Sequence, residues 1–111
     1  MLVQAEAYHA HVYFDSAQTE SARALNARAR HDLVGSAVVH DLREQPVGPH
    51  TLPMFEIEFT HDHRPAVLAW LTDHHGPHSV LIHPVTGDDL ADHQGQLAWL
   101  GEPQPLNLEG L

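Results

Sequence analysis

The sequence contains no cysteine and no lysine, and none of its apolar runs is long. The lack of cysteine excludes a disulfide framework, a thiolate zinc site and a cysteine nucleophile. Five arginines stand against fifteen acidic residues, which gives a formal charge of -10 at pH 7. Because neutralising the phosphates of a nucleic acid requires clustered basic side chains, we expect no nucleic acid partner.

No stretch approaches the roughly 18 apolar residues that suggest a membrane-spanning helix. The first residues lead from Met1 to Gln4 and Glu6 without the basic and apolar regions of a signal peptide. We therefore expect a cytoplasmic protein that does not enter a membrane. The length of 111 residues predicts a single domain, 1–111, whose small core would benefit from oligomerisation.

Alternating and helical patterns of apolar residues predict six elements in the order βαββαβ. The strands are expected at 7–14, 34–42, 54–60 and 78–83, and the helices at 17–30 and about 62–73. This order predicts a ferredoxin-like α+β sandwich, with an antiparallel sheet in the order 4-1-3-2 and both helices on one face. A turn at Thr86-Gly87, a short helical turn from Asp88 and a largely irregular, proline-rich end follow.

The face of this sheet opposite the helices collects the polar residues of three strands, because alternate side chains point to opposite faces. It should carry His9, His11, Tyr13, Glu56, Glu58 and His83. An uncovered face of this kind indicates a site, a dimer contact, or both. We expect a homodimer formed through this face or through the strand edges.

Histidine is the residue present in excess, with twelve copies. It is the commonest metal ligand and titrates near neutral pH. His9 and His11 lie two residues apart on a strand, so their Cβ atoms point the same way, roughly 7 Å apart. This spacing suits two ligands of one metal ion, one ligand beside an acid or base, or a pair of half-exposed sheet histidines. His83 could approach them, because the fourth strand neighbours the first.

Other residues could complete such a site. His50 follows Gly48-Pro49 in a proline-braced loop, and Asp92-His93 pairs a carboxylate with an imidazole that either orients a ligand or lies at the surface. Glu56 or Glu58 could complete a set of two histidines and one carboxylate, as in many non-haem iron oxygenases. The remaining histidines are expected to be peripheral, solvated or capping: His40, His61, His63, His74, His75 and His78.

Five motifs follow one another along the chain. They are YHAHVYFD at 8–15, PVGPH at 46–50, LIHPVTGDD at 81–89, DH at 92–93 and AWLG at 98–101. In order and spacing this set resembles the DOPA 4,5-dioxygenase family, and it covers nearly the whole chain. The resemblance implies a compact, commonly dimeric ferredoxin-like protein that cleaves the ring of catechols such as DOPA with dioxygen, in the extradiol manner.

The resemblance also implies a histidine-bound non-haem metal, which we expect to be Fe(II), or else zinc or another divalent ion. The expected ligands are His11, His50 and His83, with His9 or His93 as acid/base, although these roles are interchangeable among the five. Tyr13 could hydrogen-bond the ring oxygens of the substrate.

One departure from the family pattern bears on the substrate. Family members tend to carry an Asn-Arg pair near His74-His75 of this sequence. A histidine does not replace an arginine that binds a carboxylate in a bidentate manner. If that arginine meets the substrate, a catechol without a carboxylate could serve as well as DOPA.

Two other functions fit the same residues. One is a different metal-dependent reaction on the same scaffold, since fold and ligands do not fix the chemistry. The other is a non-catalytic dimeric domain that binds small aromatics. Bound iron would favour an enzyme, whereas metal-free protein that binds aromatics would favour the binding domain.

Overall fold

A computed structural model describes residues 6–93 and 97–109. Within these residues the elements are β1 (Ala7–Tyr13), α1 (Thr19–Asp32), β2 (Val38–Val39), β3 (Met54–Thr60), α2 (Arg64–His74), β4 (Val80–Pro84), α3 (Asp89–Asp92) and β5 (Ala98–Leu100). The described strands form one sheet in the order β2-β3-β1-β4-β5, and each neighbouring pair is antiparallel. Short 3-10 turns, Ser16–Gln18 and His61–His63, precede α1 and α2.

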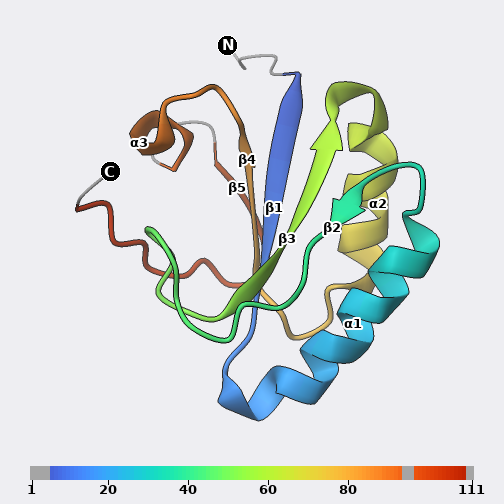
Figure 1. The fold of residues 1–111 in the computed structure, drawn as a ribbon, viewed down its shortest axis with the longest axis horizontal. Helices are drawn as coiled ribbons and strands as arrows, with labels where there is room; N and C mark the ends of the chain where they lie inside the picture. Colours follow the sequence, from blue (N-terminus) through green and yellow to red (C-terminus); the bar gives the residue numbers. More distant parts are fainter. Residues whose placement is uncertain (1–5, 94–96, 110–111) are drawn as a thin grey trace.

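The two long helices lie on one side of the sheet, and α3 and the C-terminal segment lie on the other (Figure 1). This arrangement confirms the predicted α+β fold and the strand order 4-1-3-2. Local signals explain the helix starts. The Asp15 carboxylate accepts a hydrogen bond from the Ala17 N–H at 2.9 Å, and the Gln18 side chain accepts one from the Asp15 N–H at 3.0 Å, which forms a capping box. Pro65 lies in the first turn of α2, where proline is tolerated.

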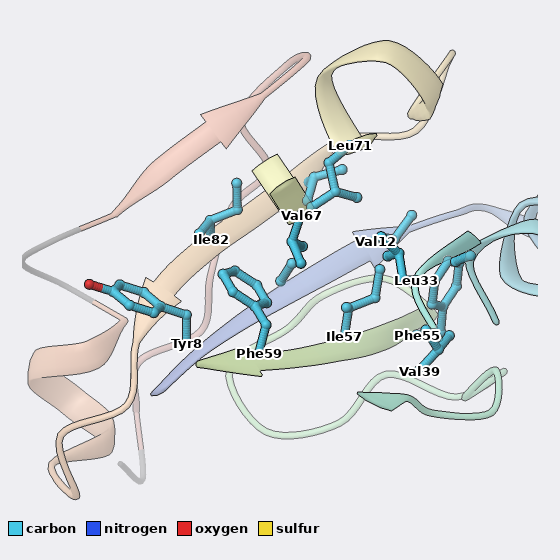
Figure 2. Close-up of a cluster of buried hydrophobic side chains, with 13 residues drawn as sticks. Tyr8, Val12, Leu33, Val39, Phe55, Ile57, Phe59, Val67, Leu71 and Ile82 are labelled. Atoms are coloured by element: carbon cyan, nitrogen blue, oxygen red, sulfur yellow. The ribbon is translucent and has the colours of Figure 1, made fainter. Parts of the chain in front are cut away.

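The main core lies between the sheet and the two helices. Figure 2 shows Tyr8, Phe59, Ile57 and Phe55 on the helix side of the sheet, together with Val12, Ile82 and the helix residues Val67 and Leu71. The rings of Tyr8 and Phe59 stack with their centroids 5.7 Å apart. Fully burying one such side chain stabilises the fold by about 1.5–3 kcal/mol. The alternation that buries these residues directs their neighbours to the opposite face.

The predicted strand at 34–42 was too long, because β2 covers Val38–Val39 alone. The chain turns after α1 at Gly35, whose φ of 81° is a left-handed value that glycine adopts without strain. Beyond β2 the chain still follows β3 through isolated bonds, from the His40 N–H to the Glu56 carbonyl (2.9 Å) and from the Arg43 N–H to the Met54 carbonyl (2.8 Å).

The edge strand β5 was not predicted. It contributes Trp99 to a second, smaller apolar cluster on the other face of the sheet, formed around Tyr13, Met54 and Leu81. Three residues are too few to show an alternating pattern, so pairing with β4 rather than local sequence defines this strand.

Two irregular segments cover part of the face that the sequence left open. His50 forms a bridge with Leu106, and the Asn107 N–H donates to the Pro49 carbonyl at 2.7 Å. The Thr51 hydroxyl donates to the Pro105 carbonyl at 2.8 Å. The loop before β3 and the C-terminal segment, both irregular, therefore hold each other in place above the sheet.

None of the helices in the described parts of the chain is long and apolar enough to cross a membrane.

Candidate active site

Histidines from four parts of the chain meet on the sheet face opposite α1 and α2. They are His9 and His11 of β1, His83 of β4, His50 of the loop before β3, and His93 after α3. Ring centroids lie 4.1 Å apart for His11 and His50, 4.3 Å for His83 and His93, and 5.0 Å for His11 and His83. All are buried except His9, whose side chain is 25% exposed. The structure thus brings together all five histidines that the sequence selected.

The strand register explains the first three of these positions. His9 and His83 are directly opposed across the β1–β4 pair, and His11 lies two residues further along β1. All three point to the same face because strand side chains alternate. The Nε2 atoms of His11 and His83 consequently lie 2.9 Å apart.

The protonation of this pair follows from its surroundings. His83 Nδ1 lies 2.9 Å from the Pro84 carbonyl oxygen, which can only accept, so Nδ1 carries a proton and donates it. In the neutral ring, the Nε2 of His83 is then unprotonated, and its lone pair points toward His11. Among the described residues, His11 Nδ1 is buried and has no hydrogen-bond partner. A shared proton or a metal ion satisfies such facing nitrogens.

His50 is held by Tyr13. The Tyr13 hydroxyl and His50 Nδ1 share a hydrogen bond of 2.6 Å. Burial raises the pKa of Tyr13 further above its usual 10, so the hydroxyl stays protonated at neutral pH. The bond fixes the His50 ring and leaves its Nε2 as the nitrogen for any ligand.

His93 is placed by its neighbour in sequence. The buried Asp92 carboxylate accepts hydrogen bonds from the Thr86 N–H at 3.0 Å and from the Thr86 hydroxyl at 2.5 Å. These bonds tie α3 to the turn after β4. The tie holds His93 beside the ring of His83.

Burial keeps the central histidines uncharged. It is the main cause that lowers the pKa of His11 well below 6.5, followed by the charges of His50 and the other neighbouring histidines. Burial and then neighbouring His93 lower the pKa of His50 to about 4. The pKa of His83 is also lowered to about 4, mainly by burial and against an opposing contribution of the Pro84 carbonyl. Neutral imidazole is the form that binds a metal.

Glu56 is the carboxylate that reaches the histidines. Its Oε1 lies 3.1 Å from His9 Nδ1 and 3.9 Å from His11 Nε2. On its other side, its Oε2 lies 3.7 Å from His40 Nε2. Glu58 is more exposed and lies 2.5 Å from His40 Nε2. Of the two predicted carboxylates, Glu56 is therefore the better placed.

The donor set fits a metal ion. Candidate ligand atoms lie within 4.8 Å of one another in three groups: His9, His11 and His83; His11, His50 and His93; and His9, Glu56 and Glu58. The predicted ligands His11, His50 and His83 are divided between the first two groups, with His11 in both. Two imidazole nitrogens bound at right angles to one ion, at about 2.1 Å each, would lie roughly 3 Å apart. The 2.9 Å between His11 and His83 matches this spacing.

A cavity of about 420 Å³ opens over the cluster. The five histidines and Glu56 form its polar wall together with Arg43 and Asp92, and Val47, Pro49, Met54 and Val85 supply apolar surface. The volume falls in the range of small-molecule sites. Sequence reasoning missed Arg43, because no local pattern connects that residue to the histidines.

One peripheral histidine was wrongly assigned. His78 is 2% exposed, and its Nδ1 lies 2.9 Å from the Tyr13 carbonyl while its Nε2 lies 2.8 Å from the Ser21 hydroxyl. It links α1 to the sheet. His74 bonds the Trp70 carbonyl in the last turn of α2, as predicted, whereas His75 bonds the His78 carbonyl in the turn that follows the helix. None of these three lines the histidine cavity.

The fold and the cluster define an α+β protein with a histidine-rich site suited to a non-haem metal. The chain matches the Dopa 4,5-dioxygenase family over residues 8–110, and it belongs to that family. A protein of Amanita muscaria named DOPA 4,5-dioxygenase is 33% identical over 111 residues, which cover 94% of this chain and 49% of the relative.

Two further proteins are similar to this chain. An uncharacterized 21.2 kDa protein of Botryotinia fuckeliana is 34% identical over 113 residues, which cover 92% of this chain and 61% of the relative. The chain therefore spans between 49% and 61% of the length of these two curated relatives. A crystal structure from Nostoc punctiforme, provisionally described as a dioxygenase, matches with a TM-score of 0.81 at 34% identity, over 95% of this chain and 90% of that one.

Proposed function

We propose that this chain is an extradiol ring-cleaving dioxygenase that acts on DOPA or a related catechol through a histidine-bound non-haem metal. The observation that carries the proposal is the convergence of His9, His11, His50, His83 and His93 on one cavity. Membership of the Dopa 4,5-dioxygenase family supports it. In such a reaction, a ring carbon–carbon bond beside the diol breaks and both atoms of dioxygen enter the product.

The proposed ligands are His11, His50 and His83. His93 shares a candidate group with His11 and His50, and Glu56 Oε1 lies 3.9 Å from His11 Nε2. Ferrous iron is the first candidate, and zinc or another divalent ion is the alternative. When bound, such a metal supplies Lewis acidity and open positions for the catechol oxygens and dioxygen. The neutral state of the three ligands at pH 7 favours its capture.

His9 is the better placed of the two acid/base candidates. It is half-buried at the cavity wall, and its Nδ1 lies 3.1 Å from the Glu56 carboxylate, to which it donates. This bond leaves Nε2 as the basic nitrogen, which takes a proton from a catechol hydroxyl and later returns it. Glu56 is thus a positioning residue for His9. His93, on the other wall, is the second candidate.

The other residues orient the ligands and the ring. Tyr13 holds His50 through their 2.6 Å hydrogen bond. Tyr13 does not itself line the cavity, and its contact with the catechol oxygens stays a prediction. Val47, Met54 and Val85 offer apolar surface against which an aromatic ring can pack.

The test is oxygen consumption by protein loaded anaerobically with ferrous iron and then mixed with a catechol in air. The expected result is stoichiometric oxygen uptake with a yellow semialdehyde product. His9→Gln and His93→Gln should lower turnover more than they lower iron content, and the exposed His31→Gln should change neither.

If iron-loaded protein turns over no member of a catechol panel, the dioxygenase proposal fails. A protein that binds catechols without metal would then be a small-aromatic-binding domain. Iron-dependent turnover of a different substrate would instead indicate another metal-dependent enzyme.

A further inference from the structure

The five arginines differ in what they contact. Their partners are Glu44 for Arg23 at 3.1 Å, Asp32 for Arg28 at 2.7 Å, Asp41 for Arg30 at 2.6 Å, and the ring of Tyr8 for Arg64 at 5.1 Å. The guanidinium of Arg43 makes no ion pair and no hydrogen bond with the residues that the structure describes. Arg64 also lacks an acidic partner among the described residues, but its guanidinium lies over the Tyr8 ring, whereas the charge of Arg43 is available to a ligand.

Arg43 is also the one arginine that lines the histidine cavity. Its backbone is fixed on both sides of a bridge to Met54, with its N–H donating to the Met54 carbonyl at 2.8 Å and its carbonyl accepting from the Met54 N–H at 3.1 Å. The backbone of Arg43 is therefore held against β3. The side chain itself is exposed, so its head is free to reorient.

The neighbouring carboxylates already have other partners. Glu44, next in sequence, pairs with Arg23, and Glu56 faces His9 and His40. Asp92 accepts its hydrogen bonds from Thr86. Among the described residues, Arg43 is thus a cation of the cavity wall whose guanidinium has no acidic partner, although Glu56 and Asp92 line the same cavity.

We propose that Arg43 is a specificity-determining residue of the cavity, whose guanidinium binds a carboxylate carried on a short side chain of the catechol. The proposal rests on the proposed function, in which the histidine site binds the catechol ring of the same substrate. A guanidinium matches a carboxylate with two parallel hydrogen bonds and fixes its orientation as well as its position.

This inference replaces the expectation drawn from the missing Asn-Arg pair. The His74-His75 segment lies at the end of α2, and its imidazoles bond to backbone carbonyls outside the cavity. An arginine absent from that segment has no bearing on what the cavity binds. If Arg43 binds a carboxylate, a catechol that carries one should bind better than a catechol without one.

The test compares two probes that differ at one group, which is negatively charged in the first and neutral in the second. They are dihydrocaffeate, a catechol with a propanoate side chain, and its primary amide. Dissociation constants and KM values are measured for the wild type, Arg43→Gln, Arg43→Lys and Arg28→Gln. The last variant removes one positive charge from α1, on the far side of the sheet, and controls for net charge.

The wild type should prefer the acid over the amide by about tenfold or more, as expected for a charge-assisted pair. Arg43→Gln should reduce this preference to near unity. Arg43→Lys should keep part of the preference, and Arg28→Gln should keep all of it. Added salt should weaken the preference in the wild type, because the arginine is exposed.

An equal preference for the acid in the wild type and in Arg43→Gln would overturn this role of Arg43. If neither probe is cleaved but the acid binds in an Arg43-dependent way, the role of Arg43 stands and the dioxygenase proposal fails. If both probes are cleaved with no effect of Arg43, the dioxygenase stands and the role of Arg43 fails.

Discussion

The Nε2 atoms of His11 and His83 face each other at 2.9 Å in the interior of the site. Because the other nitrogen of His83 donates to the Pro84 carbonyl, the pair needs a shared proton or a cation between its two rings. His11 also belongs to the neighbouring group with His50 and His93. It is therefore the residue that the two all-histidine ligand groups share.

Substituting His11 by alanine should cost more metal affinity than the roughly 10–100-fold that follows the loss of an outer contact. The measurement is the content of iron or zinc after equilibrium dialysis of protein purified without chelator or a histidine tag. His31→Ala, on an exposed helical position, is the matched control. Unchanged metal content in a folded His11→Ala protein would remove the histidine cluster as a metal site.

Replacing Tyr13 by phenylalanine should weaken metal binding by about tenfold, because His50 loses the partner that orients its ring. It should also lower the free energy of unfolding by about 1 kcal/mol, the usual cost of one hydrogen bond. Tyr8→Phe is the control, since Tyr8 lies in the core on the opposite face. Equal effects of the two variants on metal affinity would argue against the orienting role of Tyr13.

The metal-free protein should lose stability as the pH falls from about 6.5 to about 4. The pKa values of His50 and His83 are lowered from 6.5 to about 4 in the folded state, so the unfolded chain binds protons first in this window. Their contribution to stability is fully present above pH 6.5 and is lost on acidification. The expected loss is on the order of a few kcal/mol.

Urea unfolding across this pH range measures the loss, and His50→Asn should make the dependence shallower. A stability that stays constant between pH 6.5 and 4 in the metal-free protein would contradict the assignment of neutral, buried imidazoles.

The protein should be a homodimer at micromolar concentration. The core is small, and the exposed fractions of Val34 (78%) and Val38 (58%) place large apolar side chains at the surface near the β2 edge. Light scattering measures the mass. If the β2 edge forms the contact, Val38→Lys should shift the mass toward the monomer, whereas Leu90→Lys should not. A monomeric wild type would contradict the prediction.

Most of the features that could be predicted from the sequence lie in the strands. In β3 the alternation of Phe55, Ile57 and Phe59 with Glu56 and Glu58 predicted both its bounds and its faces. The same rule placed His9, His11 and His83 together before any long-range contact was known. A period of two residues is a local property, so one strand reveals it without its partners.

The parts that sequence reasoning could not place depend on contacts between distant segments. His78 is buried because Ser21, 57 residues away, bonds its imidazole. Arg43 reaches the cavity because its backbone pairs with β3 outside a regular strand. Neither position leaves a periodic pattern in its own stretch of sequence.

The loop that carries His50 depends on the residues that pair with it from the end of the chain. The Thr51 hydroxyl bonds to Pro105, 54 residues later, and Pro49 bonds to Asn107. The pairing of β1 with β4, which brings His9, His11 and His83 together, involves none of these bonds. The position of His50 in the site does depend on them, so the cavity is complete only when the two irregular segments have joined.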